Sequence, residues 1–221
     1  MLITFSGIDG AGKSTQIELL MKHLRQYGQN PIYVWTRGGY TPLFEHLKAL
    51  LRHLPRRAVP PPGNNPQRAQ VFSKGWVRRL WLTLALLDLL WVYGVQFRWW
   101  RWRGQTVVCD RYLWDTLIDF RLNFPHEQVE RWWLWRLFLR VVPRPDAAFL
   151  LLVPVEESAR RSDVKGEPFR EPPEVLARRL AEYQALAQNG YWHVMDGCQS
   201  IPELAAEILG VVQISMNRRG R

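Results

Sequence analysis

Cysteine is almost absent from the 221-residue sequence, lysine is scarce, and acidic residues are outnumbered by basic ones. The two cysteines, Cys109 and Cys198, are too few and too far apart in the chain for a disulfide framework or a zinc cluster. The apolar run at the N-terminus is too short for a secretion signal, and neither end carries a targeting motif. We therefore expect a cytoplasmic protein.

The charge balance is strongly basic, with 30 Lys and Arg against 20 Asp and Glu, and most of the cations are arginine. Because guanidinium groups bind phosphate through paired N–H groups, this balance is compatible with a nucleotide, a nucleic acid or an anionic membrane. The basic residues are dispersed rather than gathered along one polar face, so a nucleic acid is not expected as a partner. A hydrophobic content of 47% in this length allows one α/β domain with a substantial core.

A glycine-rich motif follows the first apolar run. Residues 2–5 predict a strand, and the apolar spacing after residue 14 predicts a helix. Between them, Gly7 and Gly12-Lys13-Ser14 have the spacing of a loop whose backbone N–H groups bind phosphates. In such a loop Lys13 reaches the terminal phosphates and the Ser14 hydroxyl binds Mg²⁺. A chance glycine turn is the alternative, but the position between a strand and a helix favours nucleotide binding. The residues expected to bind the nucleotide here are Gly7, Asp9, Gly10, Ala11, Gly12, Lys13, Ser14 and Thr15.

Further apolar segments alternate with helical ones along the chain. This alternation predicts a five-stranded parallel sheet with helices on both faces, forming a single domain over residues 1–215. Residues 216–221 are expected to be a disordered basic tail. The other expected strands are 31–35, 105–109, 146–153 and 192–195, and the other expected helices are 43–54, 77–103, 131–142, 155–162, 173–188 and 201–212.

The segment 77–103 is the most unusual in the chain. Asp88 is its only charged residue between Leu80 and Phe97, and tryptophan and arginine gather at its far end. We favour a buried helix whose second face packs on another copy of the chain, giving a homodimer; peripheral contact with a membrane surface is the next interpretation. The segment is nearly long enough to span a membrane, but a membrane-spanning helix would pass through the middle of the domain. Asp88 is either a substrate-binding residue or the partner of an arginine on a neighbouring helix.

Charged residues also follow the predicted strands, at the edge where open parallel sheets bind ligands. Arg37 follows the second strand, and Asp110 and Arg111 follow the third. Three arginines lie in or beside the charged segment after the fourth strand. Phosphoryl transfer between two anionic molecules needs cations from several loops and a lid that excludes water. For each residue the alternative is a solvated charge or, for Asp110, a cap on the next helix. The expected lid spans about 160–172 and carries Arg160, Arg161 and Arg170.

The residues of these motifs resemble those of thymidylate kinases. The run FSGIDGAGKSTQ at residues 5–16 and Asp110-Arg111-Tyr112 are the specific matches. Thr36-Arg37, the strand at 146–154, the arginine-rich lid and the turn at 195–197 follow in the order of that family. The chain is thus identified as a divergent member of this family of nucleoside monophosphate kinases. The resemblance implies the α/β fold of P-loop NTPases, ATP and Mg²⁺ as cofactors, and dTMP or a related acceptor.

The resemblance also implies a role for each matching residue. Asp9 would lie near the acceptor sugar, Arg37 and Arg111 would clamp the acceptor phosphate, and Asp110 would serve the metal and the catalytic centre. Gly10 stands where some members carry an arginine, so the catalytic arginine is expected in the lid, at Arg160, Arg161 or Arg170. On the adenine side, the matching residues are Cys198 and Gln199.

Two departures concern the acceptor side. Gly38-Gly39-Tyr40 directly follows Arg37, where the family continues Glu-Pro-Gly-Gly. The positions of the family's base-stacking phenylalanine and base-reading arginine fall near Leu86 and Leu90, while Phe72-Ser73 resembles that motif but lies farther upstream. The acceptor pocket is therefore expected to be altered. The alternative function is a nucleotide-binding protein of a membrane surface, or of a partner protein, with altered or lost kinase activity.

Overall fold

The computed structural model describes residues 1–36, 72–165 and 171–219. The expected helix at 43–54, with Arg37 and Arg170, lies outside these residues. Five parallel strands form one sheet in the order β2-β3-β1-β4-β5, which confirms the predicted parallel α/β architecture. The strands are β1 (Leu2–Ser6), β2 (Ile32–Trp35), β3 (Val107–Asp110), β4 (Ala147–Leu152) and β5 (His193–Asp196).

The central strand β1 is buried over its full length, as its apolar sequence predicts. It pairs with β3 on one side, where Phe5 lies beside Asp110, and with β4 on the other, where Phe5 lies beside Phe149. Because β1 and β3 end at the same level, the phosphate loop and the Asp110-Arg111 pair leave the sheet next to each other. This register brings together two motifs that are about 100 residues apart in the sequence.

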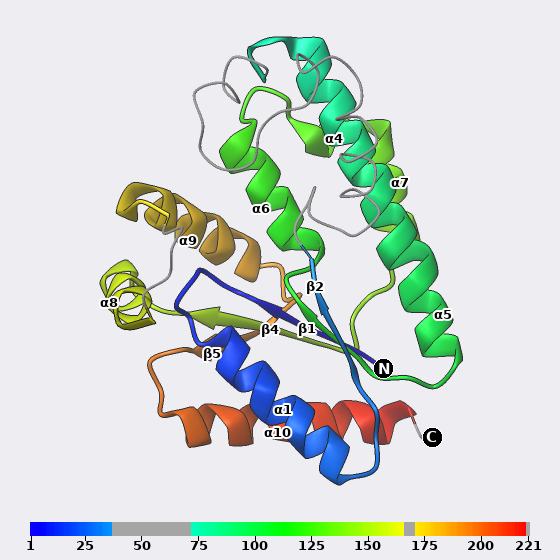
Figure 1. Ribbon diagram of the computed structural model, residues 1–221, viewed down its shortest axis with the longest axis vertical. Coiled ribbons are helices and arrows are strands. Elements are labelled where there is room, and N and C mark those ends of the chain that lie inside the picture. The colour runs from blue at the N-terminus through cyan, green and yellow to red at the C-terminus, as the bar shows by residue number, and fades with distance from the viewer. Residues whose placement is uncertain (37–71, 166–170, 220–221) are drawn as a thin grey trace.

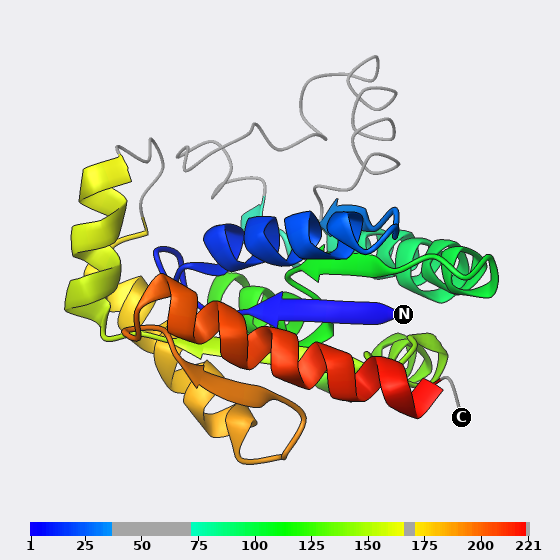
Figure 2. The same ribbon diagram turned by 90° about the horizontal axis from the view of Figure 1, so that it is seen from below.

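Helices cover both faces of the sheet (Figures 1 and 2). One face carries α1 (Lys13–Gln26) and α10 (Ile201–Arg219), which pack against each other. α8 (Val155–Lys165) stands beyond the carboxyl ends of the strands, next to the phosphate loop. The opposite face carries α4 (Gly75–Leu89), η1 (Leu90–Gln96), α5 (Phe97–Trp102), α6 (Leu113–Asn123), η2 (Val129–Arg131), α7 (Trp133–Val141) and α9 (Pro173–Ala187).

Two expectations from the sequence were wrong in detail, and one helix was missed. Helix α6 was not predicted, because Asp115 and Asp119 interrupt the apolar pattern of its buried face. The lid segment begins as helix, since α8 continues to Lys165. Residues 216–219 are helical rather than disordered: α10 runs to Arg219, and Ser215 Oγ donates a hydrogen bond to the Asp146 carbonyl at 3.2 Å.

The long apolar segment forms one continuous helical rod, α4–η1–α5, along the edge of the molecule (Figure 1). Its 28 residues are long and apolar enough to cross a membrane, but half of their most apolar 18-residue window is buried inside the fold. Leu82, Leu86 and Leu89 are fully buried in the core beside β3. This packing supports a core helix over a spanning one. The opposite face is exposed and carries five apolar side chains: Leu80, Leu87, Trp91, Val95 and Trp99.

Candidate phosphoryl-transfer site

The loop between β1 and α1 is pressed between β4 and α8. Gly7 and Gly10 have positive φ angles of 138° and 73°. A Cβ atom at Gly7 would lie 2.5 Å from the Leu151 carbonyl oxygen, and one at Gly10 would lie 2.6 Å from that of Ser158. Both positions therefore require glycine for space as well as for conformation.

The start of α1 is open to an anion. Gly12 precedes the helix without a side-chain cap, so the first-turn N–H groups remain available. They border a cavity with a volume of about 150 Å³ that the phosphate loop shares with β2 and β3. We call it the phosphate cavity; its lining residues are Asp9, Gly10, Ala11, Gly12, Lys13, Ser14, Trp35, Asp110, Arg111 and Lys165.

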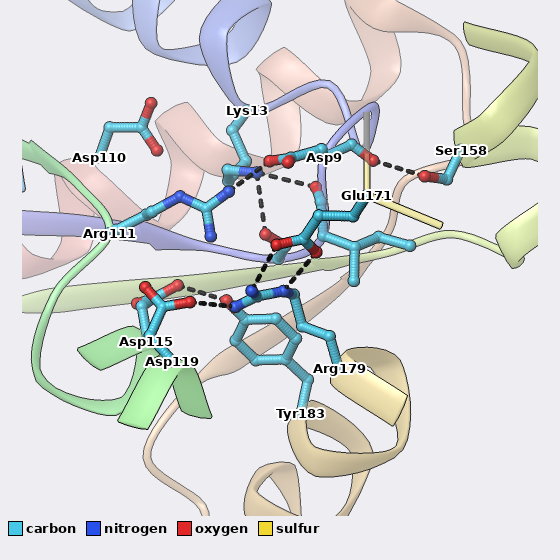
Figure 3. A network of polar contacts seen from close by, with 12 residues as sticks. Asp9, Lys13, Asp110, Arg111, Asp115, Asp119, Ser158, Glu171, Arg179 and Tyr183 are labelled. Carbon is cyan, nitrogen blue, oxygen red and sulfur yellow. Dashed lines mark hydrogen bonds and ion pairs between the residues drawn. The ribbon is translucent and has the colours of Figure 1, made fainter. Parts of the chain in front are cut away.

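Lys13 is buried beside the phosphate cavity that it lines. Its Nζ donates hydrogen bonds to the carbonyl oxygens of Gly7 at 2.9 Å and of Ile8 at 2.8 Å (Figure 3). Burial, and next the nearby charge of Arg111, lower the pKa of Lys13 to about 8, against the opposing effect of Asp110. Among the described residues, the hydrogen-bond partners of this ammonium group are these two neutral carbonyls, and a phosphate would supply an anionic one.

Asp110 and Arg111 leave β3 on the other side of the same cavity. Arg111 is 5% exposed, and its Nη2 donates to the Asp9 carboxylate. The buried Nη1 group has no hydrogen-bond partner among the described residues. Asp110 Oδ1 is likewise buried without a partner in the described part of the chain, and burial raises the pKa of this carboxyl group. A donor and an acceptor with unused hydrogen-bonding capacity therefore lie in two of the residues that line the cavity.

A layer of buried polar groups lies behind Arg111 (Figure 3). Asp115, on α6, accepts hydrogen bonds from Ser6 Oγ at 2.7 Å and from Tyr183 OH at 2.5 Å. Arg179, on α9, is 1% exposed. It pairs with Asp119 at 2.6 Å and, through two nitrogen atoms, with Glu171 at 2.9 and 2.7 Å. These contacts fasten β1, α6 and α9 to the end of the lid segment.

None of the residues in this network was predicted from the sequence to belong to the site. A signal was present: Asp115 and Asp119 are four residues apart on α6, and Arg179 and Tyr183 are four apart on α9. Residues at this spacing share one helix face, and here both faces are otherwise apolar. Charged residues on an apolar face point to a buried polar network.

The lid arginines are placed differently from each other. Arg160 is 65% exposed and forms a bidentate pair with Glu157. Arg161 also contacts Glu157, and its Nη1 donates to the Gly197 carbonyl at 3.0 Å and lies 3.5 Å from that of Gly10. Of these two arginines, Arg161 is the one in contact with the phosphate loop.

A larger pocket of about 320 Å³ adjoins the phosphate cavity between α1, α8 and the start of α10. Its size suits a nucleoside. Of the expected adenine-side residues, Gln199 lines it and Cys198 does not, while Lys165 lines both this pocket and the phosphate cavity and had no predicted role. The full lining consists of Gly10, Ala11, Gly12, Thr15, Gln16, Arg160, Arg161, Val164, Lys165, Gly197, Gln199, Ile201 and Leu204.

The residues expected to hold Mg²⁺ fit that ion. Ser14 is exposed at the start of α1 and, with Asp110, lines the phosphate cavity. The described residues contain no group of three or more His, Cys, Asp or Glu that could hold a metal by themselves. Mg²⁺ commonly takes one or two protein oxygens and completes its shell with phosphates and water, so a hydroxyl and a partner-free carboxylate oxygen suffice.

The other predicted substrate residues are only partly brought together. Asp9 lines the phosphate cavity and a second cavity of about 220 Å³ between α8 and α9. Asp88 is buried in α4, where burial raises its pKa to about 6, and it lines none of these three cavities. Arg37 and Arg170 lie outside the described residues.

Comparison with known proteins gives matches to thymidylate kinases. The family model for thymidylate kinase matches residues 101–208. The chain is 32% identical to a thymidylate kinase of Thermomicrobium roseum, with 99% of this chain and 97% of that one aligned. It is 30% identical to one of Desulfotalea psychrophila, covering 94% and 92%, and 27% identical to one of Symbiobacterium thermophilum, covering 100% and 96%.

The pKa of Lys13 predicts how nucleotide binding depends on pH. A phosphate stabilises the ammonium form, so a nucleotide binds with proton uptake once the free protein has lost this proton above about pH 8. The Kd of a non-hydrolysable nucleoside triphosphate should rise about tenfold between pH 7 and pH 9. Isothermal titration in buffers of different ionisation enthalpy measures both the affinity and the proton uptake. A Kd and proton uptake that stay constant over this range would contradict the role of Lys13 in binding the nucleotide phosphates.

Proposed function

Because the chain belongs to the thymidylate kinase family, we propose that it transfers the γ-phosphoryl group of ATP to a nucleoside monophosphate, with dTMP as the acceptor. Its relatives carry that name over nearly their whole length, which supports both the reaction and the acceptor. The sequence departs from the family after Arg37 and in the long helix, so the test below compares dTMP with other acceptors.

One observation carries the proposal: the 320 Å³ pocket and the phosphate cavity share part of the phosphate loop, and the buried Arg111 lines the cavity from the other side. A donor in the pocket would place its phosphates on the loop. An acceptor phosphate bound to Arg111 Nη1 would then face them within one small space. Holding the two reacting groups close together and in line is the main requirement for phosphoryl transfer.

Each residue has a defined task in this mechanism. The N–H groups at the start of α1 bind the donor phosphates, and Lys13 neutralises charge on the transferred group. Ser14 and Asp110 would hold Mg²⁺, which would offset negative charge on the donor phosphates. Arg111 orients the acceptor phosphate through Nη1 while Nη2 stays on Asp9.

The lid supplies the remaining positive charge. Both arginines pair with Glu157, but Arg161 also donates to the Gly10 carbonyl of the phosphate loop, so we assign transition-state stabilisation to Arg161 among the described lid arginines. Lys165 lines both donor pocket and phosphate cavity and is assigned to the donor phosphates. Arg170 remains a second candidate for the catalytic arginine of the lid, as predicted from the sequence.

Lys13→Ala tests the reaction, with Lys22→Ala as the matched control, because Lys22 is exposed on the same helix. We expect Lys13→Ala to lower kcat for dTMP phosphorylation on the order of 10²- to 10³-fold and Lys22→Ala to leave it within about twofold. The measurement is ATP consumption with dTMP, dUMP, dCMP, dGMP and AMP as acceptors, alongside circular dichroism of each variant. Wild-type protein that phosphorylates none of these acceptors would overturn the proposal.

The exposed face of the long helix supports a second copy of the chain as a partner. Leu80, Leu87, Trp91, Val95 and Trp99 are each 48–51% exposed and lie seven or four residues apart. No exposed charge interrupts this stripe between residues 80 and 97. Continuous apolar stripes of this kind usually mark an interface, and their spacing suits the packing of one helix on another.

Trp91→Glu tests the dimer, because it places a charge in the centre of the stripe. We expect light scattering after size exclusion to give about twice the 26.1 kDa chain mass for the wild type and the single-chain mass for Trp91→Glu. Ile214→Glu is the control: Ile214 is equally exposed, at 55%, but lies on α10, so the mass should not change. A monomeric wild type that sediments with anionic vesicles would instead identify the stripe as a membrane-contact surface.

A further inference from the structure

The backbone of Arg111 is held in a conformation that residues other than glycine rarely adopt. Its φ angle is 70°, in the left-handed region. A residue with a side chain is strained in this region, so neighbouring contacts must hold it there. The Arg111 N–H donates to the Phe5 carbonyl at 2.8 Å, which holds one side of the residue against β1.

The other side of the residue is held by side chains. Thr36 Oγ1 donates to the Arg111 carbonyl oxygen at 2.7 Å, and Cys109 Sγ donates to the same oxygen at 3.0 Å. The Thr36 N–H in turn donates to the Asp110 carbonyl at 3.1 Å. Thr36 therefore donates to the carbonyl groups of both Asp110 and Arg111. The side chains of Thr36, Cys109 and Arg111 are all buried.

Tyr93 completes this arrangement. Its hydroxyl lies 2.6 Å from Thr36 Oγ1. Since the single Thr36 hydroxyl proton goes to the Arg111 carbonyl, Tyr93 must be the donor in this pair. Burial raises the pKa of Tyr93 well above its usual range, so the phenol keeps the proton that it donates.

Tyr93 reaches Thr36 from an irregular part of the long helix. Residues Leu90–Gln96 form the π-helical turn η1, a feature that is frequent at functional sites. Within it, a Cβ atom at Gly94 would lie 2.8 Å from Val141 Cγ1, so the turn packs closely on α7. The irregular turn and its close packing fix the position of the Tyr93 ring.

We propose that Tyr93 and Thr36 are positioning residues for the acceptor phosphate: their linked hydroxyls hold the Arg111 peptide in its left-handed conformation and so aim the guanidinium into the phosphate cavity. This inference rests on the proposed function for its kinetic consequence. It gives the long helix a direct connection to the acceptor side of the site, because Tyr93 lies two residues from Trp91 and from Val95 of the exposed stripe.

Thr36→Val and Thr36→Ser form the test pair. Valine keeps the shape of threonine without the hydroxyl, whereas serine keeps the hydroxyl. We expect Thr36→Val to raise the KM for dTMP about tenfold while the KM for ATP stays within about twofold, and Thr36→Ser to stay close to wild type for both. Tyr93→Phe should shift the KM for dTMP in the same direction as Thr36→Val.

Thr106→Val is the control for the loss of a buried threonine hydroxyl. Thr106 is 8% exposed, and its hydroxyl donates to Gln29 Oε1 at 2.9 Å, outside the cavities described above. Its removal should lower stability to a similar degree without changing the KM for dTMP. An unchanged KM in Thr36→Val and Tyr93→Phe, or an equal rise in Thr106→Val, would overturn the inference.

A crystal structure of Thr36→Val separates this inference from the proposed function. If the wild-type protein phosphorylates no nucleoside monophosphate, the proposed function fails, but the backbone of Arg111 can still be compared. We expect its φ angle to leave the left-handed region in Thr36→Val and to remain there in Thr36→Ser. A φ angle near 70° in both variants would overturn the positioning role.

Discussion

Most of the site depends on one constraint, the burial of a guanidinium group at the carboxyl end of the sheet. A buried charge is tolerated only when it is paired and hydrogen-bonded. Asp9 pairs with one side of Arg111, while Nη1 on the other side has no partner among the described residues. The protein thus keeps a desolvated donor group beside the phosphate loop. An anion that binds there meets a positive charge that water does not screen.

The buried polar layer behind Arg111 follows from the same constraint. Burial by itself would lower the pKa of Arg111, but the nearby carboxylates of Asp9, Asp119 and Asp115 raise it overall, so the guanidinium stays charged. Fixed hydrogen bonds from Ser6 and Tyr183 hold the Asp115 carboxylate in this layer. Satisfied networks of this kind are rigid. Rigidity matters here because aligning two phosphate-bearing molecules requires cations that do not move.

The sequence was enough to predict the parallel sheet, the phosphate loop and the position of Asp110-Arg111, because these depend on local patterns and on the rule that parallel strands end at one edge. It was not enough to predict α6 or the network, since Asp115 and Arg179 acquire their partners only through packing between α6, α9 and β1. The directions in which side chains point could not be predicted from sequence patterns either. Arg160 and Arg161 are adjacent in the chain, yet of the two only Arg161 donates to a carbonyl of the phosphate loop.

The central claim is that Arg111 receives the acceptor phosphate, and Arg111→Lys tests it most directly. Lysine keeps the charge but loses the planar fork that can hold Asp9 and a phosphate together. Steady-state kinetics with dTMP and ATP varied in turn should show kcat/KM for dTMP lowered on the order of 10- to 100-fold and the KM for ATP unchanged within about twofold. Unchanged kinetics for dTMP, or an equal loss for both substrates, would contradict this account.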